Sequence, residues 1–138
     1  MKTLSTVALM VTVAPMLVVV TMSCIDPEYF GGGPYPLNVL MMTLFAVITV
    51  PMWPTYMPAI ILAPIVMRRV ASLPRFHTLP LPSVLVLSVA TGAVAGACVM
   101  LPIVLMARPP IWAARWTVAG ATSGAVTLAL ISLVYRRN

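Results

Sequence analysis

Four long stretches of the chain carry no charged residue, and they limit what it can fold into more than any other feature. They cover residues 3–25, 29–67, 78–107 and 116–135. A helix needs about 20 apolar residues to cross the hydrocarbon core of a bilayer, at a rise of about 1.5 Å per residue. Each stretch is long enough, so we expect an all-α chain whose helices cross a membrane.

The composition points the same way. Of the 138 residues, 62% are hydrophobic and 7% are charged, whereas about a quarter of the residues of a soluble domain are charged. The strict alternation expected of membrane barrel strands is absent. We therefore predict one transmembrane domain over residues 1–138, a polytopic membrane protein with about four transmembrane helices. The spans are placed near residues 6–25, 38–67, 82–106 and 114–135.

The second predicted span is irregular, because it is longer than one crossing needs and too short for two. It contains Pro51, Pro54, Pro58 and Pro64. Each proline removes a backbone donor and crowds the preceding turn, so a straight helix is not expected. Three interpretations compete: a kinked and tilted helix, a break with an interfacial half, and a shifted boundary. A broken helix could line a binding site, as in transporters, but membrane helices tolerate proline, so we favour the kinked helix.

The basic residues predict the orientation. An N-terminus in the cytoplasm would place six basic residues inside and two outside. The inner six are Lys2, Arg68, Arg69, Arg75, Arg136 and Arg137, and the outer two are Arg108 and Arg115. The positive-inside rule then predicts that both termini are cytoplasmic, and we expect an integral protein of the bacterial inner membrane. The net charge of +6 is attributed to topology and contact with the lipid bilayer, not to nucleic acid.

The first span has two alternative interpretations. Lys2 followed by an apolar run resembles a signal peptide, and Cys24 could accept a lipid after cleavage. Thr21 stands where a lipoprotein signal usually has a branched apolar residue. The apolar run also continues to Ile25, so we favour an uncleaved anchor.

Two GxxxG motifs predict how the last two spans pack. Gly92 and Gly96 form the first pair, and Gly120 and Gly124 form the second. Glycines four residues apart share one helix face and let two backbones approach closely. The connection between the two spans is short, so both pairs fall at a similar depth. We predict a close-packed hairpin of the third and fourth spans, with these four glycines as helix-packing residues.

The sequence offers few residues for chemistry. No Asp, Glu, Lys, Arg, Asn or Gln lies deep within a predicted span, although such residues usually mark proton relays and coupled transporters. Asp26 and Glu28 are interpreted as a solvated turn. His77 stands alone, without the partners that a zinc site or a catalytic triad needs. Cys24 and Cys98 are interpreted as free thiols, with a disulfide as the alternative. We therefore predict no catalytic, cofactor-binding or metal-binding residues.

The function predicted from these features is non-enzymatic. We expect an accessory, scaffold or assembly subunit whose helix faces contact another membrane protein or a second copy of itself. The alternative is a small channel or transporter subunit with a hydroxyl-lined path. That path would be lined by Thr49, Thr55, Ser88, Thr91 and Thr122.

Overall fold

Helices make up most of the part of the chain that the computed structural model describes. It describes residues 2–28, 35–48 and 53–136, and these include no β-strand. The helices are α1 (Lys2–Ile25), α2 (Pro36–Ile48), α3 (Trp53–Ala71), α4 (Pro74–Thr78), α5 (Leu81–Val99), α6 (Leu101–Met106) and α7 (Pro110–Arg136).

Proline determines where most of these helices begin. The helices α2, α4 and α7 begin on a proline, and α3, α5 and α6 have one at the second position. Proline is tolerated in the first helical turn, where the backbone N–H has no partner within the helix, and its fixed φ suits that position. The same chemistry separates α5 from α6. Pro102 has no N–H to donate to the turn before it, and at the end of α5 the N–H of Met100 is shared between the carbonyl oxygens of Gly96 and Ala97, at 3.3 and 3.2 Å.

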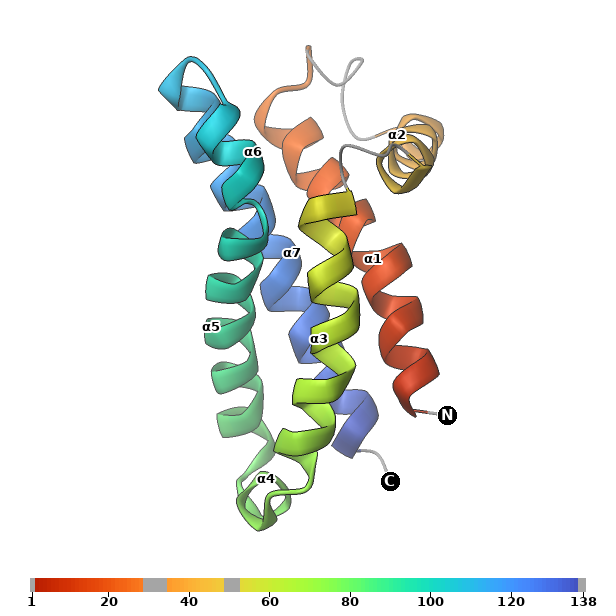
Figure 1. The fold of residues 1–138 in the computed structure, drawn as a ribbon, viewed down its shortest axis with the longest axis vertical. Helices are drawn as coiled ribbons and strands as arrows, with labels where there is room; N and C mark the ends of the chain where they lie inside the picture. Colours follow the sequence, from red (N-terminus) through yellow and green to blue (C-terminus); the bar gives the residue numbers. More distant parts are fainter. Residues whose placement is uncertain (1, 29–34, 49–52, 137–138) are drawn as a thin grey trace.

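Four long helices form an elongated bundle in which neighbours in the chain alternate in direction (Figure 1). The helix α7 lies between α1 and α5 and contacts both, while α3 contacts α1 more than it contacts α5. The short helix α4 closes the end of the bundle at which α3 ends and α5 begins. The helix α2 is seen nearly end-on, so it crosses the long helices at a steep angle.

Three helices are long and apolar enough to cross a membrane, judged by length and composition. They are the Thr3–Ile25 part of α1, the whole of α5 and the whole of α7. The helix α3 is not among them, and it carries Arg68 and Arg69 in its last turn. The structure is thus compatible with an integral membrane protein, and the fourth crossing stays a prediction.

The predicted second and third spans do not appear as single helices. The described part of 38–67 belongs to α2 and α3, which run in different directions (Figure 1). Residues 49–52, with Pro51, lie outside the described residues, and the proline-kinked helix is not confirmed. The predicted third span, 82–106, is divided at Met100 into α5 and α6, because Pro102 interrupts the helical hydrogen bonds.

Two buried clusters hold the bundle together, one toward each end. One joins α1 and α7 to the end of α5 through Val18, Met22, Ala119 and Met100, the residue that follows α5. The other, which includes Met67, Phe76, Ile131 and Tyr135, brings α3 and α4 against α7. Because the second cluster includes Phe76, the turn between α3 and α5 is packed onto the bundle.

Candidate functional site

The four glycines singled out in the sequence meet where α5 and α7 cross. A Cβ atom added to Gly124 would lie 2.8 Å from Gly96 Cα, and one added to Gly96 would lie 2.8 Å from the carbonyl carbon of Gly120. Real Cβ atoms essentially never come within 3.0 Å of such an atom. The two backbones therefore contact each other directly, and no side chain fits between them.

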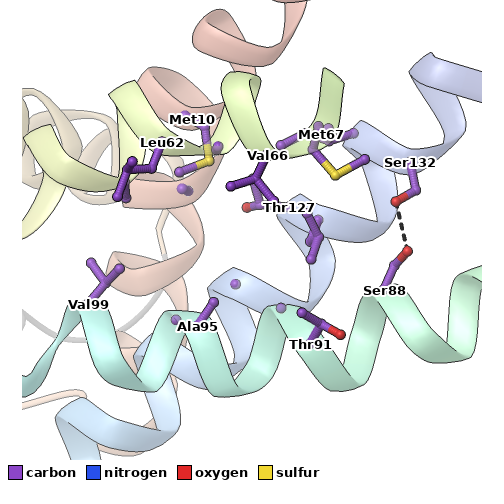
Figure 2. A pocket seen from close by; sticks show the side chains of 18 of the residues that line it. Met10, Leu62, Val66, Met67, Ser88, Thr91, Ala95, Val99, Thr127 and Ser132 are labelled. Carbon is purple, nitrogen blue, oxygen red and sulfur yellow. Dashed lines mark hydrogen bonds between the residues drawn. The ribbon is translucent and has the colours of Figure 1, made fainter. Parts of the chain in front are cut away.

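Two buried hydroxyl hydrogen bonds lie beside the glycine contact, one toward α4 and one toward α1. Ser88 Oγ and Ser132 Oγ are 2.7 Å apart and share a buried hydrogen bond between α5 and α7 (Figure 2). Ser123 Oγ donates to the carbonyl oxygen of Ala14 at 2.7 Å, which joins α7 to α1. Sequence analysis missed Ser132, although it follows Gly124 by eight residues and so lies on the same helix face.

An apolar groove lies between α3 and α5, with α7 as its floor. Its volume is about 630 Å³. Leu62 and Val66 of α3 stand on one side of it and Thr91 and Ala95 of α5 on the other (Figure 2). The floor includes Thr127, which is 2% exposed and whose Oγ1 has no hydrogen-bond partner in the described part of the chain.

The α4 end of the groove is built by hydrogen bonds and flanked by basic residues. The ring of His77 contacts the carbonyl oxygen of Ala71 at 3.0 Å, with Nε2 as the contacting atom. Arg136 Nη2 donates to the carbonyl oxygen of Leu79, a groove residue. His77 thus stabilises the turn between α3 and α4. Exposed arginines surround this turn: Arg68, Arg69 and Arg75.

An ion pair at the opposite end corrects the prediction for Asp26. This carboxylate pairs with the guanidinium of Arg115, and the two side chains are 20% and 27% exposed. The Arg115 guanidinium carbon also lies 5.0 Å from the ring centroid of Trp112. The prediction of a solvated turn was wrong for Asp26, because folding brings the first turns of α7 beside the end of α1.

The residues considered for metal or nucleophilic chemistry do not converge in the described part of the chain. Cys24 and Cys98 are free and exposed. No group of three or more His, Cys, Asp or Glu side chains there could hold a metal ion.

The hydroxyls proposed for a conducting path lie in different places. Ser88 is engaged with Ser132. Thr91 lines the groove, while Thr122 is exposed and donates to the carbonyl oxygen of Val118 at 2.9 Å. Thr49 and the side chain of Thr55 lie outside the described residues.

The fold and this site define an all-helical protein with three helices able to cross a membrane. Comparison of the chain with protein-family models, with curated proteins and with solved structures finds no match.

Proposed function

We propose that the protein is a non-enzymatic integral membrane protein that serves as an accessory, scaffold or assembly subunit for another membrane protein. In this proposal α1, α3, α5 and α7 all cross the bilayer of the bacterial inner membrane. The α5–α7 hairpin, packed through its glycines, is the rigid element. Both termini and α4 face the cytoplasm, in accord with the basic residues at that end.

The observation that carries the proposal is the exposed apolar face of α2. With 13 residues, α2 is about 20 Å long, which is short of a bilayer core of about 30 Å. Val39 is buried, and Met42 packs against the cluster of α1, α5 and α7. The other face carries large apolar side chains that are between 48% and 73% exposed: Leu37, Leu40, Met41 and Leu44.

These four residues, which we call the α2 stripe, follow the spacing of one helix face. The helix α2 runs across the bundle and, at 13 residues, is too short to cross (Figure 1). Its stripe is therefore best explained by contact with an apolar surface beyond the chain. The proposed occupant is another membrane protein that packs against this end of the bundle.

The test is site-specific photo-crosslinking in intact cells. A photoreactive amino acid at Leu40 or Met41 should give one discrete adduct with another membrane protein. The same probe at Val86, which is 69% exposed on the side of α5, should give none. Equal adducts at Leu40 and Val86 would contradict the proposal, as would an adduct with a second copy of this chain alone.

A flux assay separates this proposal from the transporter alternative. The chain's two carboxylate side chains, Asp26 and Glu28, both follow α1, and coupled transporters usually rely on a carboxylate within the membrane. Proteoliposomes that contain the purified protein alone should accumulate no substrate under an imposed pH gradient. Accumulation in this assay would replace the scaffold proposal with a transporter.

A further inference from the structure

The lining that α3 contributes to the groove is about as long as one bilayer leaflet is deep. Along α3 its lining runs from Pro58 to Val70, which is about 18 Å of helix at about 1.5 Å per residue. Half of a bilayer core of about 30 Å is about 15 Å. The α3 side of the groove thus matches the length over which one acyl chain lies within its leaflet, and its side chains Leu62 and Val66 are apolar and more than half exposed.

One end of this groove is positively charged. Val70, Phe76 and Leu79 line the groove at its α4 end. Arg69 precedes Val70 in the chain, and Arg75 precedes Phe76.

Arg136 lies at the same end and is not saturated by the protein. Its Nη2 donates to the carbonyl oxygen of Leu79, whereas its Nη1 is buried and has no hydrogen-bond partner in the described residues. A guanidinium offers five N–H donors, so Arg136 has donors that the described residues do not use. With Arg68, Arg69 and Arg75, it makes four arginines among the described residues at this end of the bundle.

No carboxylate side chain balances these arginines. The chain has two acidic residues, and both follow α1 at the opposite end, where Asp26 already pairs with Arg115. The positive charge beside α4 therefore has no acidic side chain to neutralise it. Arginine binds phosphate oxygens strongly, and anionic headgroups attract basic residues at the membrane surface.

The turn that carries Arg75 is fixed in place. Phe76 is buried among Met67, Val84 and Ile131, and Thr78 Oγ1 donates to the carbonyl oxygen of Arg75 at 3.2 Å. The backbone of Arg75 is thus held before any ligand arrives, so binding would order little besides its side chain.

The geometry points to a binding site for one anionic phospholipid, with an acyl chain in the α3–α5 groove and the phosphate against Arg75 and Arg136. The charge distribution favours this occupant over a partner helix. The groove is apolar along its length and positive at one end, as an anionic amphiphile requires. A lipid site beside α4 is independent of the α2 stripe, which lies on a different helix.

The test is native mass spectrometry of the purified full chain in mild detergent, titrated with phosphatidylglycerol or with phosphatidylcholine. One phosphatidylglycerol should be retained at concentrations at which phosphatidylcholine is lost. Ala95→Phe fills the groove and should weaken retention about tenfold or more, while Val94→Phe, on an exposed position next to it, should not. Circular dichroism should show that both variants are folded.

A second pair of matched variants tests the part of the site that would bind the headgroup. Arg75→Gln should weaken phosphatidylglycerol retention about fivefold, whereas Arg108→Gln, an exposed arginine at the other end, should leave it unchanged. Equal retention of the two lipids would overturn the site, and so would equal effects of the two arginine variants. Inorganic phosphate that displaces the lipid at comparable concentration would contradict the role of the acyl chain. A photo-probe at Ala95 that labels a protein instead of lipid would assign the groove to a helix.

Discussion

Ser88 of α5 and Ser132 of α7 share a buried hydrogen bond, with their Oγ atoms 2.7 Å apart. Within a membrane such bonds join helices directly, because no water competes for the hydroxyls, yet their measured contribution is modest at about 0.6 kcal/mol. The pair extends the glycine contact toward α4, by about one turn of α5 and two turns of α7. It therefore sets the register of α7 against α5 on the side that forms the floor of the groove.

A double-mutant cycle of Ser88→Ala and Ser132→Ala should give a coupling of about 0.6 kcal/mol in the free energy of unfolding. Each single variant leaves the other hydroxyl unpaired, so the double variant should be more stable than the sum of the singles implies. Unfolding by denaturant in mixed micelles provides the measurement. Ser83→Ala, at an exposed position of α5, is the control and should have no effect. A coupling of zero would mean that the bond does not form.

Gly124→Ala should destabilise the bundle by about 1–3 kcal/mol, because the added methyl group overpacks the contact with Gly96. This direction is informative, since alanine is the better helix former by about 1 kcal/mol. The matched control is Val94→Ala, on an exposed position of α5, which should change stability little. If Gly124→Ala raised the melting temperature, the backbones would not be in contact.

Asp26→Asn should remove the ion pair between the end of α1 and the start of α7, and should lower stability by about 1 kcal/mol. Arg115→Gln should have a similar effect, and the two changes together should cost less than their sum. Glu28→Gln alters an exposed acid two residues away and is the control. High salt should diminish the effect of Asp26→Asn, because mobile ions screen partly exposed charges. An identical effect from Glu28→Gln would show that net charge matters and not the pair.

The sequence predicted the helical class and the positions of α1 and α7. An uninterrupted apolar run that is just long enough to cross a bilayer leaves few ways to place a helix in it. The interruption at Met100 was not predicted, although Pro102 is the cause. Proline is compatible with both a kink and a break, and only packing against neighbours decides between them. The same ambiguity explains why residues 38–67 were predicted as a single helix, whereas the described part of this range lies in α2 and α3.

The candidate site was partly accessible from the sequence. The glycines could be singled out because their spacing alone defines a helix face. Neither the groove nor the pairing of Asp26 with Arg115 could be predicted from the sequence, because both depend on the distances between separate helices. The groove exists because α3 packs mainly against α1, which leaves space between α3 and α5. No local sequence pattern encodes the distance between α3 and α5.

The number of crossings can be measured by cysteine accessibility. In a background with Cys24 and Cys98 replaced by serine, single cysteines at Glu28, His77 and Arg108 would be treated in intact cells with a thiol reagent that does not cross membranes. Four crossings predict labelling at 28 and 108 and protection at 77, because α3 then returns the chain to the cytoplasm before α5 leaves it. If positions 28 and 77 were labelled alike and position 108 oppositely, α3 would not cross, and the bundle would have three membrane-spanning helices with its termini on opposite sides.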